Sequence, residues 1–168
     1  MAVAKRLLLL RHARAERGGA SDRKRPLTPA GRADAVRVAR QAREHGWLPD
    51  LILCSDSQRT RETAACFAES AECQAAILYD EALYLGSDDA ILAAVRGAPE
   101  DVGVLMVIGH NPGFASLAQE LSDFTVPDEF PAAGLAVFEV TAAAWREVAA
   151  ETVRLAAFVS PDDLRDGT

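Results

Sequence analysis

Short runs of apolar residues alternate with stretches of helical periodicity along most of the chain, and this rhythm restricts the folds that the sequence can adopt. Leu7–Leu10, Leu51–Cys54 and Gly103–Ile108 are continuous apolar runs, which is typical of strands that are buried on both faces of a sheet. Between them, as in residues 32–44, apolar side chains recur at helical spacing. Strands that alternate with helices predict an α/β fold, a three-layer α/β/α sandwich around a mainly parallel sheet.

The other predicted elements continue this order. Further helices are expected over about Arg59–Ser70, Asp89–Arg96 and Phe114–Leu121, a weaker strand over Ala76–Tyr79, and two more strands over Gly134–Val140 and Thr152–Val159. Gly134–Val140 alternates like a strand with one exposed face, and we expect Thr152–Val159 to pair with it as an antiparallel closing hairpin. Since no repeat or linker interrupts the chain, residues 1–168 are expected to form a single domain, with about the last eight residues as a flexible tail.

The composition narrows the class of protein. The 168 residues are 49% hydrophobic and 26% charged, which indicates a globular chain rather than a disordered one. No apolar run approaches the roughly 20 residues of a membrane helix, and Leu7–Leu10 is too short for a signal peptide. Three cysteines without a CxxC pair fit a reducing compartment better than a disulfide framework. We expect a cytoplasmic protein with no membrane partner, whose oligomeric state the sequence does not specify.

Charge is distributed unevenly. Eighteen Lys and Arg against 25 Asp and Glu give a net charge of −7, yet residues 1–45 carry twelve basic and four acidic side chains, a net charge of +8. Part of this excess, at Arg37, Arg40 and Arg43, fits the solvated face of a helix. Because the whole chain is acidic and only 6% aromatic, nucleic-acid binding is disfavoured. A local positive site for a small anion fits better.

Polar and charged residues follow three of the apolar runs, at the points where strands are expected to end. Arg11–Arg14 follows the first run, Ser55–Arg59 the second, and Gly109–Gly113 lies at the end of the last. Ligands of open α/β sheets bind beyond the carboxyl ends of the strands. The sequence therefore predicts that two histidines and two arginines from these segments converge on one edge of the sheet.

Such a convergence describes a phosphate pocket. Guanidinium groups bind phosphate bidentately and stay charged, and the arginines here are Arg11 and Arg59, beside His12 and His110. Taken singly, a histidine at a strand end is more often structural, and Arg11 fits a surface position. Their coincidence at one edge favours a site, and the pocket predicts neither a metal ion nor another cofactor.

The turn after Ile108 adds a second anion-binding element. We expect Asn111 to cap the following helix and Pro112 to occupy its first position, where the missing N–H costs no hydrogen bond. A helix N-terminus presents free N–H groups and partial positive charge. Gly109–Gly113 also fits an ordinary strand-to-helix turn.

Two other phosphate chemistries lack support. Cysteine phosphatases need C-x5-R, whereas four residues separate Cys54 from Arg59 and six separate it from Arg61. Cys54 lies within an apolar run and is expected to be buried in the core. Since the chain has neither GxxxxGK[ST] nor GxGxxG, nucleotide binding is not indicated.

These motifs resemble those of the histidine phosphatase superfamily, which has the phosphoglycerate mutase-like form of the α/β/α sandwich. Arg11-His12-Ala13 resembles its RHG motif with alanine in place of glycine, and Ser55–Thr63 resembles its second arginine motif, S-x-x-x-R-x-x-x-T. Gly109-His110 is similar to its second histidine motif. Within the superfamily, the short chain, residues 21–28 and the Gly109–Gly113 turn most resemble SixA-type phosphohistidine phosphatases.

The resemblance implies a metal-independent mechanism. His12 would attack the phosphorus and form a covalent phosphohistidine that water then hydrolyses. Arg11 and Arg59 would hold the non-bridging oxygens and offset their charge in the transition state. His110 would be a further hydrogen-bond donor to the phosphoryl group.

The resemblance also nominates residues around this centre. Those expected to bind or guide the substrate are Arg14, Ser21, Arg25 and Asn111. Glu81 is the nearest candidate for the general acid that many members carry after the third strand, and a solvated surface carboxylate is an equally good interpretation. A protonated P–N bond breaks with little acid assistance, so the weak signal at Glu81 favours phosphohistidine. Ala13 fits the motif if its φ is negative.

Three functions remain open from the sequence. The first is a phosphatase that removes phosphate from phosphohistidine on a signalling or phosphotransfer protein. The second is a phosphomonoesterase of the same fold that acts on a small phosphorylated metabolite. The third is a non-catalytic module that binds phosphate or a phosphoprotein, and the presence of both histidines and both arginines argues against it.

Overall fold

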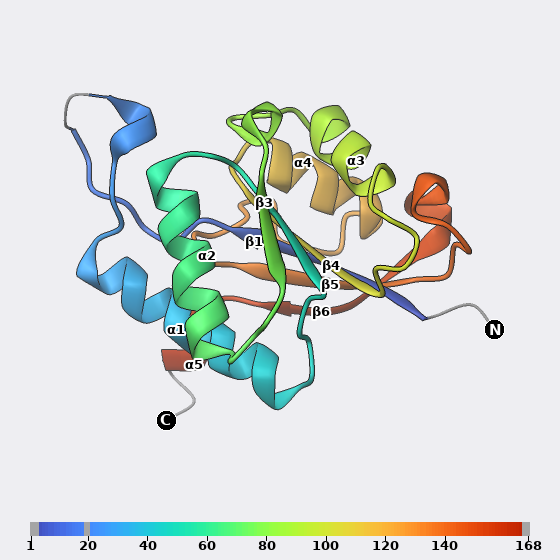
Figure 1. Cartoon of the computed structure of the whole chain (residues 1–168), viewed down its shortest axis with the longest axis horizontal. Coiled ribbons are helices and arrows are strands. Elements are labelled where there is room, and N and C mark those ends of the chain that lie inside the picture. Colours follow the sequence, from blue (N-terminus) through green and yellow to red (C-terminus); the bar gives the residue numbers. More distant parts are fainter. Residues whose placement is uncertain (1–3, 19–20, 166–168) are drawn as a thin grey trace.

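The fold is a six-stranded sheet between two layers of helices (Figure 1). A computed structural model describes residues 4–18 and 21–165. The strands are β1 (Lys5–Arg11), β2 (Leu51–Cys54), β3 (Ala76–Tyr79), β4 (Val104–Gly109), β5 (Leu135–Val140) and β6 (Val153–Val159). The α-helices are α1 (Pro29–Glu44), α2 (Gln58–Ser70), α3 (Asp88–Arg96), α4 (Gly113–Leu121) and α5 (Pro161–Arg165). Short 3-10 helices are η1 (Asp22–Lys24), η2 (Glu81–Leu83), η3 (Trp145–Glu147) and η4 (Ala150–Thr152).

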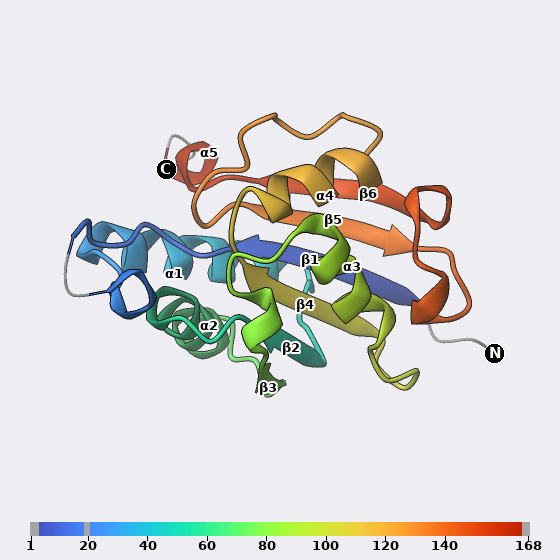
Figure 2. The same ribbon diagram turned by 90° about the horizontal axis from the view of Figure 1, so that it is seen from above.

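The strand order β3-β2-β4-β1-β5-β6 puts β1 near the middle of the sheet, and Figure 2 shows β3 and β6 at its opposite edges. β1 pairs in parallel with β4, and β2 pairs in parallel with both β3 and β4. β5 runs antiparallel to its neighbours β1 and β6. The predicted mainly parallel α/β/α sandwich with an antiparallel closing strand is confirmed.

The leucine run of β1 is buried because each face of the sheet has its own core. Leu7 and Leu9 pack into a core that α3 and α4 cover, whereas Leu8 and Leu10 pack into the core beneath α1 and α2. Figure 1 shows α3 and α4 on one side of the sheet and α1, α2 and α5 on the other. Alternate side chains of one strand therefore hold both helical layers in place.

Three helices begin at the polar caps that their sequences supply. Thr28 accepts a hydrogen bond from the Gly31 N–H at the start of α1, and Ser57 and Ser87 cap α2 and α3 in the same way. Pro29 occupies the first turn of α1, so this helix begins three residues before its predicted start at about residue 32. At its other end, the chain leaves the helix through Gly46, which has φ +72°.

Two expectations differ from the structure. β5 is buried on both faces rather than on one, because its side chains pack alternately into the two cores. β6 is instead the strand with alternating exposure. Residues 161–165 form α5 with Pro161 buried, where the sequence predicted a flexible tail, and the last three residues lie outside the described part. Among the described residues, no helix is both long and apolar enough to cross a bilayer.

Candidate active site

The ends of β1, β2 and β4 meet at one edge of the sheet, as the sequence predicts. Their hydrogen bonds continue one residue past the strands, with the His12 N–H donating to the Gly109 carbonyl and the Ser55 N–H to the Ile108 carbonyl. The rings of His12 and His110 consequently lie 5.3 Å apart between centroids. Parallel pairing places residues distant in sequence side by side, and here it brings the two motif histidines together.

His12 has a defined tautomer. Its Nδ1 lies 2.7 Å from the carbonyl oxygen of Ala13, and since a carbonyl only accepts, Nδ1 carries the proton. The Nε2 atom therefore keeps its lone pair, which a nucleophilic imidazole requires. Burial, followed by repulsion from Arg11, Arg59 and Arg25, lowers the pKa of His12 from 6.5 to about 4, against the opposite effect of the Ala13 hydrogen bond. The ring is neutral at physiological pH.

His110 has the opposite tautomer. A guanidinium nitrogen of Arg59 donates to its Nδ1 at 3.2 Å, so Nε2 bears the proton and donates to the Ser55 hydroxyl at 2.8 Å. Burial, His12 and Arg59 lower the pKa of His110 to about 3. In this state the nitrogen that faces Arg59 is an acceptor. The role expected for His110, donation to a phosphoryl group, therefore requires Nδ1 to gain a proton or Nε2 to turn from Ser55.

The two arginines leave buried donors without partners. Arg11 donates through NH1 to the Phe130 carbonyl at 2.9 Å, and Arg59 donates through NH1 and NH2 to Asp22. The Nε–H groups of both arginines are buried and have no hydrogen-bond partner among the described residues. Unsatisfied buried donors on cationic groups favour an anionic ligand, because an oxyanion satisfies both the hydrogen bonds and the charge.

The loop after β1 is fixed by α1 and α2. The Ala13 N–H donates to the Thr63 hydroxyl at 3.0 Å, and this hydroxyl donates to the Arg59 carbonyl at 2.7 Å. Gly31 on α1 packs so closely that an added Cβ would lie 2.2 Å from the Arg14 carbonyl oxygen. Ala13 itself is buried and is not among the described residues with positive φ, so alanine fits the position usually held by glycine.

Two further residues beside the site were missed by sequence reasoning. The Asp22 carboxylate accepts from Arg59 NH2 at 3.1 Å and from Arg25 Nε at 3.0 Å, and it also accepts from the Tyr84 hydroxyl. The Tyr84 hydrogen bond, Arg59 and Arg25 lower the pKa of Asp22 to about 2, against the opposing effect of burial. The Tyr84 ring also lies edge-on to His110. Asp22 belongs to a segment that the resemblance singled out, but no sequence signal marks Tyr84.

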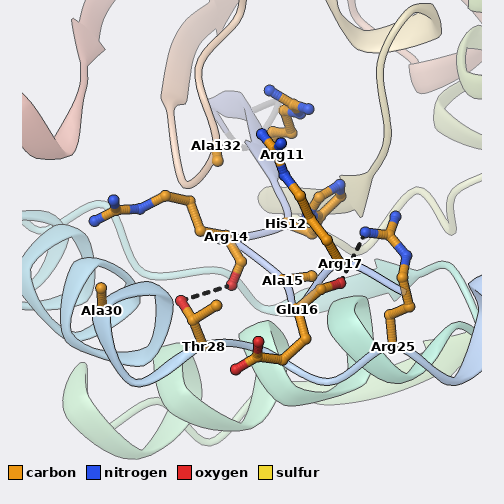
Figure 3. A pocket seen from close by; sticks show the side chains of 10 residues that line it. All are labelled: Arg11, His12, Arg14, Ala15, Glu16, Arg17, Arg25, Thr28, Ala30 and Ala132. Carbon is orange, nitrogen blue, oxygen red and sulfur yellow. Dashed lines mark hydrogen bonds between the residues drawn. The ribbon is translucent and has the colours of Figure 1, made fainter. Parts of the chain in front are cut away.

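A cavity of about 720 Å³ opens beside His12 (Figure 3). The residues that line it are Arg11, His12, Arg14, Ala15, Glu16, Arg17, Arg25, Thr28, Ala30 and Ala132. Arg59 and His110 do not line the cavity and are almost completely buried. The cavity therefore gives solvent access to His12, whereas Arg59 and His110 are enclosed by protein.

The predicted substrate-binding residues divide into two groups. Arg14 and Arg25 line the cavity, while Ser21 is exposed and does not line it. Asn111 does not cap α4, since the helix begins at Gly113 after Pro112. Its amide instead donates to the Phe130 carbonyl at 2.9 Å, the same oxygen that Arg11 contacts, and so ties the β4 turn to the loop before β5.

Glu81, the predicted general acid, lies apart from the site, whereas Cys54 lies in the core. Glu81 begins η2, its side chain is exposed, and no hydrogen bond or ion pair joins it to a described residue of the site. Cys54 is completely buried, as predicted, and burial raises the pKa of its thiol to about 12. Within the described ranges, no group of three or more His, Cys, Asp or Glu side chains has the arrangement of a metal site.

Comparison with known proteins assigns the fold and site to a class. Residues 7–84 match the histidine phosphatase superfamily (branch 1). An uncharacterised chloroplastic protein of Arabidopsis thaliana is 30% identical over 179 residues, which cover 95% of this chain and 79% of that protein. The chain belongs to the histidine phosphatase superfamily, and it is a phosphatase.

Within this class the chain is similar to SixA proteins. A SixA protein from Nakamurella multipartitia, provisionally described as a phosphohistidine phosphatase, is 31% identical with a TM-score of 0.82, over 94% of this chain and 96% of that one. A protein histidine phosphatase SixA solved with tungstate shares the fold at 21% identity and a TM-score of 0.80, over 95% and 99% of the two chains. A mycobacterial glucosyl-3-phosphoglycerate phosphatase, at 19% identity and a TM-score of 0.63 over 94% and 99%, also shares the fold.

Proposed function

We propose that this chain hydrolyses the P–N bond of phosphohistidine on a signalling or phosphotransfer protein, through a covalent intermediate on His12. The observation that carries the proposal is the state of His12, a neutral imidazole whose Nδ1–H is fixed by Ala13 and whose Nε2 lone pair is free. The similarity to SixA proteins supports the choice of substrate.

The first step forms the phosphoenzyme. The Nε2 lone pair of His12 attacks phosphorus in line, the substrate P–N bond breaks, and its electron pair goes to the departing imidazole nitrogen, which leaves as neutral imidazole once protonated. The Nε–H groups of Arg11 and Arg59 bind non-bridging oxygens and offset the charge of the transition state. Because the Nδ1–H group stays hydrogen-bonded to the Ala13 carbonyl, this bond stabilises the positive charge that develops on the His12 ring.

The second step regenerates the enzyme. Water attacks phosphorus, the bond to Nε2 breaks, and the electron pair returns to the ring as inorganic phosphate forms. A protonated phosphoramidate breaks without a carboxylic acid next to the leaving group. The exposed position of Glu81 agrees with this. The free thiols of the three cysteines agree with the cytoplasmic location expected from the sequence.

A small-molecule phosphomonoesterase is the second candidate. The cavity of about 720 Å³ lies within the size range of pockets that hold metabolites, and the same centre can attack a phosphate ester. An ester leaving group needs a proton donor, and no side chain identified at this site supplies one. We therefore rank this activity below phosphohistidine hydrolysis.

A rapid-quench experiment tests the proposal. The wild type is mixed with a ³²P-labelled phosphohistidine peptide in the presence of chelator, and acid-labile, alkali-stable label on the protein is measured. His12→Ala is expected to lose both label and turnover, whereas His45→Ala, the matched control at an exposed histidine outside the cavity, should keep both.

The other outcomes decide between the candidates. Faster turnover of phosphate esters than of the phosphohistidine peptide would favour the phosphomonoesterase. Phosphate binding without label or turnover would favour a non-catalytic module. Turnover that persists in His12→Ala would show that the assignment of the nucleophile is wrong.

A further inference from the structure

The cavity in front of His12 carries more positive charge than one phosphoryl group requires. Arg11 and Arg59 already supply buried donors at the reacting centre. Arg14, Arg17 and Arg25 line the cavity as well, together with only one acidic residue. Its volume of about 720 Å³ is several times that of a phosphoryl group. A ligand that fills this cavity and balances its positive charge has a second anionic group besides the phosphoryl group.

The three outer arginines differ in what they have left to bind. Arg17 is exposed and makes no hydrogen bond or ion pair with any described residue. Arg14 is half exposed, and its Nε and NH2 atoms donate to the buried Asp34 carboxylate at 3.2 and 2.8 Å, which leaves NH1 without a described partner. Arg25 is committed to Asp22 and to the Glu16 carbonyl. Arg14 and Arg17 are therefore the groups available to a ligand.

Arg14 is held in place rather than mobile. Asp34 is buried, and it binds Arg37 and Arg165 in addition to Arg14. In Figure 3 the Arg14 side chain extends away from His12 toward α1, and the Glu16 carboxylate points away from the guanidinium groups. A fixed cation at a distance from the reacting centre suits a second anionic group that is separate from the phosphoryl group.

The cavity lining favours a protein over a metabolite as the source of that group. Pockets for small molecules are lined mainly by large apolar and aromatic residues, whereas the apolar residues that line this cavity are the small Ala15, Ala30 and Ala132. Arg14 and Arg17 are at the exposed rim, where ion pairs form in the presence of water, as at the polar edge of a protein interface. The basic first 45 residues, in a chain with a net charge of −7, present this positive rim to an acidic partner.

We propose that Arg14 and Arg17 form a recognition surface for acidic side chains that flank the phosphohistidine of a protein substrate. This inference rests on the proposed function, because it specifies the surroundings of the same phosphoryl group. It assigns Arg14 and Arg17 to substrate selection rather than to the chemical step.

Two phosphohistidine peptides of equal length test the inference. One carries Asp and Glu on both sides of the phosphohistidine, and the other carries Asn and Gln at the same positions. Exposed ion pairs contribute modestly, each up to about a fivefold preference. We expect the kcat/KM of the wild type to be about five- to tenfold higher for the acidic peptide at low salt, and the ratio to approach one at 0.5 M salt because of screening.

Variants assign the effect to the two arginines. Arg17→Gln should lower the ratio of the two kcat/KM values part of the way toward one, and the double variant with Arg14→Gln should bring it close to one. Arg40→Gln removes the same charge from an exposed position on α1 that lines a different surface hollow, and it should keep the wild-type ratio. Arg17→Gln alone decides the matter if the double variant is unstable, since Arg17 has no described partner to lose.

The outcomes separate this inference from the proposed function. Equal kcat/KM values for the two peptides with the wild type at low salt would overturn the recognition surface and leave the phosphohistidine activity standing. An equal loss of preference in Arg40→Gln would also overturn it, because the effect would then reflect net charge alone. Hydrolysis of neither peptide would overturn both.

Discussion

The protonation of His12 offers the sharpest test of the active-site chemistry. A solvent-exposed histidine with a pKa of 6.5 is only about 3% neutral at pH 5. Burial and three nearby arginines lower the pKa of His12 to about 4, so about 90% of it is neutral at pH 5. The pool of nucleophile at pH 5 is therefore about 30-fold larger than for an unperturbed histidine.

The chain is well suited to a direct measurement, because it contains only three histidines. Selective ¹⁵N labelling of histidine gives ring signals that His45→Gln and His110→Gln assign by elimination. A titration from pH 3 to pH 8 should show half-protonation of His12 near pH 4. Above pH 5, where both rings are mostly neutral, the ring nitrogens should report a proton on Nδ1 of His12 and on Nε2 of His110.

The same shift predicts how stability depends on pH. Since the pKa of His12 is lower in the folded state, the unfolded chain binds a proton between pH 6.5 and 4 that the folded chain does not. The contribution of His12 is thus fully present above pH 6.5 and is lost as the pH falls toward 4, by about 3 kcal/mol in total. Urea unfolding of the wild type and of His12→Ala at pH 7 and pH 4.5 isolates this loss, because His110, whose pKa is also lowered, is present in both proteins.

Two results would refute the reasoning. A His12 midpoint at pH 6 or above would show that burial and the arginines do not control its charge. A proton on Nε2 of neutral His12 would show that the hydrogen bond to Ala13 does not set the tautomer, and the proposed attack by the Nε2 lone pair would fail with it.

Three substitutions test the surroundings of the site. Asp22→Asn removes a half-exposed negative charge beside Arg59 and should tighten inhibition by inorganic phosphate about fivefold, measured as Ki. Gly31→Ala places a Cβ 2.2 Å from the Arg14 carbonyl oxygen, so we expect unfolding free energy to fall by about 2–3 kcal/mol and kcat/KM to fall with it. Asp34→Asn should lower the stability by about 2–3 kcal/mol, a fall in Tm of about 5–10 °C by calorimetry, because three arginines lose a buried carboxylate.

Each of the three substitutions has a result or a control that would contradict its explanation. A weaker phosphate inhibition in Asp22→Asn would mean that Asp22 is needed to orient Arg59 rather than to oppose the anion. Gly97→Ala is the matched control for Gly31→Ala, since its added Cβ has no neighbour closer than 3.5 Å. A Tm for Asp34→Asn within 1 °C of the wild type would contradict the stabilising role given to the buried carboxylate.

The order of strands and helices could be predicted from the sequence because the pattern is local. A leucine run such as Leu7–Leu10 is stable only where both faces are covered, and helical spacing indicates one covered face. The boundaries of β2 and β3 were predicted without error, since polar residues follow both strands directly. The expected exposure of β5 was wrong because burial of a strand's face depends on the side chains packed against it, and these come from segments distant in the sequence.

The location of the site also followed from the sequence. Parallel strands end at the same edge of a sheet, so the residues after Leu10 and Ile108 had to meet. The capping role expected for Asn111 failed because α4 begins only at Gly113, after Pro112. The Asn111 amide nitrogen donates instead to the Phe130 carbonyl, nineteen residues away in the sequence.

The sequence by itself predicted the layers, the strand-end motifs and the convergence of Arg11, His12, Arg59 and His110, because periodicity and adjacency to strands are properties of neighbouring residues. Only the tertiary structure decided which ring nitrogens of His12 and His110 carry protons, since their partners follow from packing. It also decided that Asp22 meets Tyr84, 62 positions away, and that Asp34 holds Arg165. Such contacts join elements that are distant in the sequence, and no local sequence pattern records which of them will meet.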